Sequence, residues 1–99
     1  MERYIMLFKF TDKGIGNVQD SPSRAEAFKA VAAQVGAKVE CQYWTFGEFD
    51  GALVLTAPDD TAVGALAIGL GRLGNVRTTM LRAFDITEFR KMLEKMPKF

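Results

Sequence analysis

Six side chains in this sequence could orient a small molecule. They are hydroxyl, carboxylate and guanidinium groups on or beside otherwise apolar segments: Tyr43, Thr45, Asp50, Arg77, Thr79 and Arg82. A small-molecule site is usually an apolar pocket in which a few polar groups fix the orientation of the ligand. We therefore expect these six residues to be the ligand-binding candidates. No set of residues forms a catalytic signature, so the sequence assigns neither a ligand nor a reaction.

The alternative use of the same groups is catalysis without a cofactor, as in an isomerase, a decarboxylase or a monooxygenase. Asp50 or Glu48 would then be the base, and Tyr43 a proton donor. Arg77 or Arg82 would polarise the substrate. The chain contains no histidine, which removes Ser-His-Asp and Cys-His nucleophiles and the histidine-rich zinc and iron sites. We expect no metal and no cofactor.

The composition predicts one small domain that shares its core with a second copy. Residues 1–99 suffice for a single domain, and a chain this short buries roughly two-thirds or less of its unfolded surface. Hydrophobic residues make up 48% of the chain, which is more than a small monomer readily hides. A homodimer or a higher homo-oligomer is therefore the expected state.

Charge, hydropathy and cysteine content limit the remaining partners. A net charge of +1 gives no broad basic surface, and no helix-turn-helix pattern is present, so nucleic acid is not an expected partner. No stretch approaches the roughly 20 apolar residues that span a membrane, so we expect no membrane partner. Cys41 is the sole cysteine, which excludes an internal disulfide and fits a reducing, cytoplasmic location.

Apolar periodicity predicts the elements that would position the candidate groups. Alternation predicts four strands, over residues 3–10, 38–46, 51–57 and 75–84, of which the second and third form a hairpin. Helical spacing predicts three helices: one over 22–35, one after Asp59-Asp60, and one ended by Pro97. The expected caps are the Ser21 hydroxyl before Pro22, an aspartate of the pair Asp59-Asp60, and Thr87. Residues 11–20 follow neither period and are expected to be a loop.

The order of these elements predicts an α+β fold of the ferredoxin-like kind, β-α-β-β-α-β with a C-terminal helix. The first and third strands are apolar on both sides, whereas the second and fourth carry interleaved polar residues, as edge strands do. That pattern favours an antiparallel sheet in the order 4-1-3-2. Two helices can cover only one face of such a sheet. We expect the other face to pair with a second copy, as a dimeric α/β barrel.

Three local patterns have structural explanations. The run Gly69 to Gly74 has the letters of the dinucleotide fingerprint, but it ends a helix instead of opening one. Asp50 could accept backbone N–H bonds that hold the hairpin reversal. Arg82, if it faces inward, needs either a ligand or a carboxylate of the chain, and an ion pair is the structural alternative. Strand alternation also directs Arg77 to the face opposite Arg82.

Several separated motifs in the same order resemble the GYD-domain family over nearly the whole chain. They are Thr11-Asp12-Lys13-Gly14, Tyr43-Trp44-Thr45, Gly47-Glu48-Phe49-Asp50-Gly51, Ala57-Pro58-Asp59-Asp60, Leu73-Gly74-Asn75-Val76-Arg77-Thr78-Thr79 and Leu81-Arg82-Ala83-Phe84. Phe49 stands where the family has its namesake tyrosine. The resemblance implies a ferredoxin-like, dimeric α/β-barrel arrangement, and it implies no particular activity.

The hypothesis drawn from these observations is a homo-oligomeric module that binds a small molecule of unassigned identity. The uncovered sheet face, the 11–20 connection and the six polar candidates support it. A cofactor-free enzyme of the dimeric α/β-barrel type and a purely structural oligomerisation domain are the alternatives.

Overall fold

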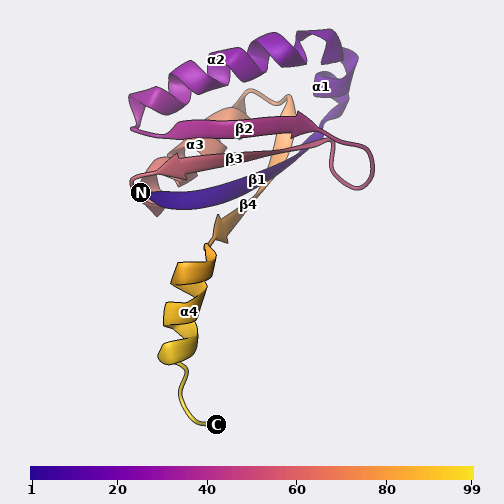
Figure 1. Cartoon of the computed structure of the whole chain (residues 1–99). Coiled ribbons are helices and arrows are strands. Elements are labelled where there is room, and N and C mark those ends of the chain that lie inside the picture. The colour runs from indigo at the N-terminus through magenta and orange to yellow at the C-terminus, as the bar shows by residue number, and fades with distance from the viewer.

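Four antiparallel strands form a single sheet in the order β2-β3-β1-β4 (Figure 1). The computed structural model describes all residues, 1–99. The predicted order 4-1-3-2 is this order counted from the other edge, so the predicted antiparallel α+β sheet is confirmed. The strand bounds are Glu2–Phe10 for β1, Lys38–Trp44 for β2, Gly51–Ala57 for β3 and Val76–Ala83 for β4.

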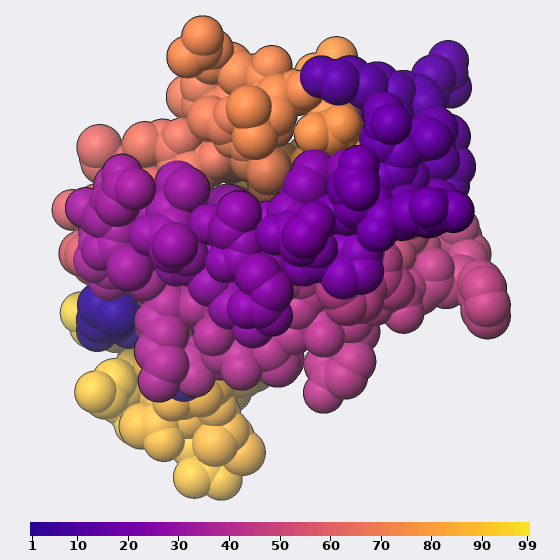
Figure 2. Space-filling view, turned by 90° about the horizontal axis from the view of Figure 1, so that it is seen from above, coloured from indigo at the N-terminus to yellow at the C-terminus, as the bar shows by residue number.

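Helices α2 (Ser21–Gln34) and α3 (Asp60–Arg72) lie over one face of the sheet, as Figure 2 shows from above. The core sits between this face and the two helices. Met6 of β1 and Leu55 of β3 are its largest fully buried side chains, and Phe28 of α2 and Leu66 of α3 belong to the same cluster. The inward positions of the strands alternate with outward ones, as a half-covered sheet requires.

The connection over residues 11–20 is not the loop that the sequence predicts. It contains a short helix α1 (Asp12–Gly16) and a 3-10 turn over Val18–Asp20. The hydroxyl of Thr11 caps α1 by accepting the Gly14 N–H at 3.1 Å. A Cβ on Gly14 would overlap the Asn75 carbonyl oxygen, so only glycine lets α1 pack this closely on the start of β4. A helix of five residues is too short to give a readable apolar period, which is why the pattern missed it.

Two of the predicted helix caps are wrong and one is confirmed. The N-cap of α2 is Asp20, while the Ser21 hydroxyl accepts the indole N–H of Trp44 at 3.0 Å. Helix α4 (Ile86–Glu94) is capped by Asp85, which forms a capping box with Glu88, and not by Thr87. Any of several neighbouring polar residues can cap a helix, so spacing alone did not decide between them. Asp59 caps α3 as predicted.

Tyr4 connects the core to the start of α3. Its hydroxyl donates to the Asp60 carboxylate at 2.5 Å, and the residue is 2% exposed. Burial first, then the hydrogen bond to Asp60 and the charges of Asp60 and Asp59, raise the pKa of Tyr4 to about 12. A tyrosine in the unfolded chain has a pKa near 10, so the folded chain holds more protons between these two values.

The free energy of unfolding should therefore fall between pH 10 and pH 12. The Tyr4 contribution is fully present below about pH 10, and roughly 2 kcal/mol of it is lost by about pH 12. Urea unfolding of the unmodified protein and of Tyr4→Phe at pH 8, 10 and 12 measures this loss. The variant lacks the phenol, so the stability difference between the two proteins should shrink as the pH rises. A constant difference would contradict the prediction.

Helix α4 stands away from the rest of the molecule (Figure 1). The radius of gyration is 15.2 Å, against about 13 Å for a compact domain of this length. The apolar residues of its stripe and its immediate flanks are exposed, for example 54% for Phe89 and 50% for Leu93. The others are Ile86, Met92 and Met96. The apolar side of this amphipathic helix is therefore open to solvent in the single chain.

Candidate functional site: the open sheet face

The open face is the side of the sheet that α2 and α3 leave uncovered. Residues paired directly across antiparallel strands point to the same side, so the strand register defines its members. Two rows cross its centre: Tyr43, Ala52, Leu7 and Thr79, and next to them Cys41, Val54, Ile5 and Leu81. Every one of these side chains is half-buried or exposed. The chain therefore presents a mainly apolar surface on this side and covers it with nothing of its own.

Cationic groups lie at both ends of the open face: Arg3 and Lys38, in one row with Thr56, at one end, and Lys9 and Arg77 at the other. Lys9 and Arg77 are directly paired across β1 and β4, so two like charges share one position of the ladder. Glu48 offsets part of this charge at 4.0 Å from the Lys9 ammonium, but its side chain is 76% exposed. Lys9 also lies 5.3 Å from the centre of the Phe49 ring. This end of the open face favours an anionic neighbour.

Three of the six predicted site residues share the open face, although they lie on its two opposite edge strands, β2 and β4. Tyr43 and Thr79 belong to the same cross-strand row, and Arg77 lies two residues from Thr79 along β4. Tyr43 is 65% exposed. These three side chains flank the apolar centre of the face with a phenol, a hydroxyl and a guanidinium.

Thr45 and Asp50 lie instead in the connection between β2 and β3. The Thr45 hydroxyl donates to the Phe49 carbonyl at 2.7 Å. The Asp50 carboxylate accepts the Phe10 N–H at 2.7 Å, and the Asp50 N–H donates to the Phe8 carbonyl at 2.8 Å. As the structural explanation predicts, the Asp50 carboxylate accepts a backbone N–H, but this N–H belongs to β1 and not to the hairpin reversal. The Thr45 hydroxyl is bonded within the reversal, and the Asp50 carboxylate ties the hairpin to β1.

Arg82 lies on the opposite side of the sheet from Arg77, as strand alternation predicts. It pairs directly with Tyr4, its guanidinium contacts the carboxylate of Glu2 in an ion pair, and it lies 3.8 Å from that of Glu88. It also stacks 4.5 Å above the Phe84 ring. The ion pair that was the structural alternative to a ligand is therefore present. Arg82 does not share a surface with Tyr43 and Thr79.

Replacing Asp50 by alanine should lower the free energy of unfolding by about 1–3 kcal/mol. The substitution leaves the Phe10 N–H without its acceptor in a half-buried position. Urea denaturation measures the change, and Glu48→Ala in the same reversal is the matched control. Glu48 makes only a long, exposed ion pair, so its removal should change stability by less than about 0.5 kcal/mol. Equal effects of the two substitutions would contradict the role given to Asp50.

The six polar candidates include neither the hydrophobic residues that dominate the open face nor Arg24. Arg24 lines a cleft between α2 and α3 on the other side of the sheet. A usable signal was present, because Arg24 stands four residues before Phe28 and seven before Val31, and so on the apolar stripe that these two residues form along the predicted helix. A cation on such a stripe indicates a buried charge that needs a partner.

No group of three or more Cys, Asp and Glu side chains gathers anywhere in the chain in a way that could hold a metal ion. None of the helices has the length and apolar character needed to cross a membrane. What the open face offers is a large apolar contact surface with cationic groups at both ends.

Two comparisons with known proteins found similar sequences. The family model described as "GYD domain" matches residues 4–93. A relative from Thermus thermophilus, named "Glutamine synthetase and cystathionine beta-lyase binding protein", is 28% identical over 89 residues. The alignment covers 89% of this chain and 94% of the relative. The relative's name describes a protein that binds other proteins.

Proposed function

Because this chain belongs to the GYD domain family, and because the resemblance to that family implies paired sheets, we propose that it works as a homo-oligomeric binding module. One observation carries the proposal: the open sheet face and the apolar stripe of α4 both lack a covering partner within the chain. Burial of apolar area is the main driving force of association, and surfaces of this kind mark interfaces. Two copies would pair sheet to sheet, as in a dimeric α/β barrel.

The size of the open face supports a role for α4 in the same interface. Four strands, the longest of nine residues, give a face of roughly 25 by 20 Å. A stable interface buries about 800 Å² on each partner, which is more than this footprint provides. Helix α4 extends beyond the sheet with Phe89 and Leu93 exposed, so it can supply the remaining area against the second copy.

The bound partner of the assembled module is, in our proposal, another protein. The Thermus thermophilus relative is named for binding glutamine synthetase and cystathionine beta-lyase, and an enzyme partner for this chain follows by similarity. A partner of either type would be expected in the cytoplasm, the location predicted from the sole cysteine.

A small molecule held between the paired sheets is the second candidate. It is favoured by Tyr43, Thr79 and Arg77, which would point into the space between two such sheets. Thr45, Asp50 and Arg82 would take no direct part, because their polar atoms are bonded within the chain.

Native mass spectrometry of the purified protein tests both parts. We expect a dimer or a multiple of it, and a reproducible added mass if a small molecule is retained. Adding purified glutamine synthetase or cystathionine beta-lyase, followed by light scattering on the eluted complex, tests the protein partner. A stable monomer at micromolar concentration would overturn the proposal, whereas a dimer that binds neither enzyme would remove only the choice of partner.

A further inference from the structure

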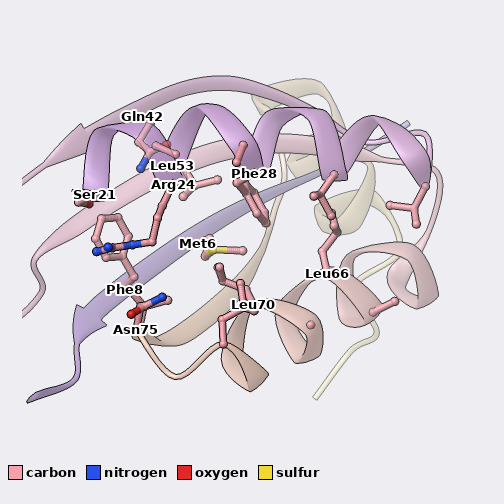
Figure 3. Close-up of a pocket in the computed structure, with 18 of the residues that line it drawn as sticks. Met6, Phe8, Ser21, Arg24, Phe28, Gln42, Leu53, Leu66, Leu70 and Asn75 are labelled. Atoms are coloured by element: carbon pink, nitrogen blue, oxygen red, sulfur yellow. The ribbon is translucent and has the colours of Figure 1, made fainter. Parts of the chain in front are cut away.

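A cleft of about 470 Å³ runs between α2 and α3, on the face of the sheet opposite the open face (Figure 3). Its floor and walls are apolar and come from both sheet and helices; they include Met6, Phe28, Leu53, Leu66 and Leu70. Lining residues on and just after α2 extend from Ser21 to Val35, a length of about 20 Å at the helical rise per residue. The volume is in the range of small-molecule sites, about 300–1,000 Å³.

Arg24 places a positive charge at one end of this cleft. Its Nη1 donates to the Asn17 carbonyl at 3.1 Å. Its Nη2 is shielded from solvent and has no hydrogen-bond partner. Arg24 takes part in none of the ion pairs of the chain. A shielded guanidinium nitrogen without a partner is costly, so an additional acceptor at this end of the cleft would stabilise Arg24.

Other hydrogen-bonding groups lie at the same end. Ser21, 8% exposed, accepts from Trp44 at 3.0 Å, and its own hydroxyl proton is left to donate. The Asn75 side chain lies on the far side of Arg24 from α2, while Phe28 and Leu66 lie farther along the cleft (Figure 3). The cleft thus has a polar, cationic end and a long apolar end. Such a division suits a molecule with one anionic group and an aliphatic tail.

We propose that this cleft binds an aliphatic monocarboxylate of medium chain length. The carboxylate would accept from the Arg24 guanidinium, after a side-chain rotation that turns Nη2 toward the ligand, and from the Ser21 hydroxyl, and the tail would lie against Phe28, Leu66 and Leu70. Arginine is suited to this task because its fork-shaped donors match the two oxygens of a carboxylate. This site is separate from the proposed binding of a protein, because it lies on the other side of the sheet from the open face, through which two copies are proposed to pair.

Isothermal titration calorimetry with decanoate, and separately with decanol, tests the proposal on the full chain. We expect saturable decanoate binding that weakens by about tenfold or more in Arg24→Met, which retains an unbranched side chain and removes its charge. Decanol binding should change by less than about threefold, because the tail contacts remain. Arg24→Lys keeps the charge without the fork and should give an intermediate affinity for decanoate.

Lys29→Met is the matched control, since Lys29 is an exposed residue of α2 that does not line this cleft and pairs only with Glu26. It should bind decanoate like the unmodified protein. Leu81→Glu, a substitution on the open face that should disrupt the proposed pairing, should also keep decanoate binding, which separates this site from the proposed dimer. The proposal is overturned if the unmodified protein gives no saturable decanoate binding. Equal affinities of Arg24→Met and Lys29→Met, in variants that retain the native circular dichroism spectrum, would overturn it as well.

Discussion

Leu81→Glu should convert the assembled protein into monomers. Leu81 lies on the open face directly opposite Ile5, in the same row as Val54. It is 44% exposed in the single chain, so a carboxylate there is solvated in the monomer. In a sheet-to-sheet dimer the same carboxylate would be desolvated, and each dimer would contain the substitution twice. We expect the dissociation constant to rise by at least about a hundredfold.

Analytical ultracentrifugation across a concentration series measures this change. Ile68→Glu is the matched control, because Ile68 is an exposed apolar residue of α3, on the helix side of the sheet. It should leave the dissociation constant unchanged. Dissociation caused by Ile68→Glu and not by Leu81→Glu would assign the interface to the helices. If two copies pair through other surfaces, neither substitution should change the dissociation constant.

Gly51→Ala should strongly destabilise the fold, although it adds only one methyl group. A Cβ at Gly51 would overlap the Phe8 ring and lie 2.7 Å from the Tyr43 carbonyl oxygen. Phe8 is buried and Tyr43 is held in the β2–β3 ladder, so neither can move without repacking the core or breaking the strand pairing. We expect a loss of about 3 kcal/mol in the free energy of unfolding, and a melting temperature lower by at least about 10 °C.

Gly64→Ala is the control for this experiment, because both substitutions add the same methyl group. Gly64 lies inside α3, and a Cβ at this position would meet no atom within 4 Å. Replacing a helical glycine by alanine should therefore stabilise the protein by up to about 1 kcal/mol. Opposite signs in urea denaturation would support the close approach of β1, β2 and β3 at Gly51. Two small effects of equal sign would contradict it.

The tertiary structure gives the motif around Gly47 and Asp50 a mainly architectural explanation. Gly47 has a φ of 107°, which other residues rarely adopt. Asp50 accepts the β1 backbone N–H, and Gly51 leaves room for the Phe8 ring. Phe49, which stands at the family's tyrosine position, contributes a carbonyl to Thr45 and a ring to Lys9. These contacts join the hairpin to the central strand.

The strands, the two covering helices and the strand order of the sheet could all be predicted from the amino-acid sequence alone. Alternation and helical spacing report which side of each element is apolar, and the two-sided apolar character of β1 and β3 identifies them as central. The opposite directions of Arg77 and Arg82 followed from the same alternation. These are local or periodic properties, so they do not depend on how the neighbouring elements pack.

Which polar groups share a surface, and which are already bonded within the chain, depends on the tertiary structure. Arg82 is engaged by Glu2, and Asp50 by the backbone of β1. Both contacts join positions far apart in sequence or on different elements, and their geometry depends on register and loop path. The lack of a hydrogen-bond partner for Arg24 Nη2 likewise depends on how α2 and α3 lie over the sheet. Periodicity predicts the side to which a residue points, whereas its partners are set by packing across the whole chain.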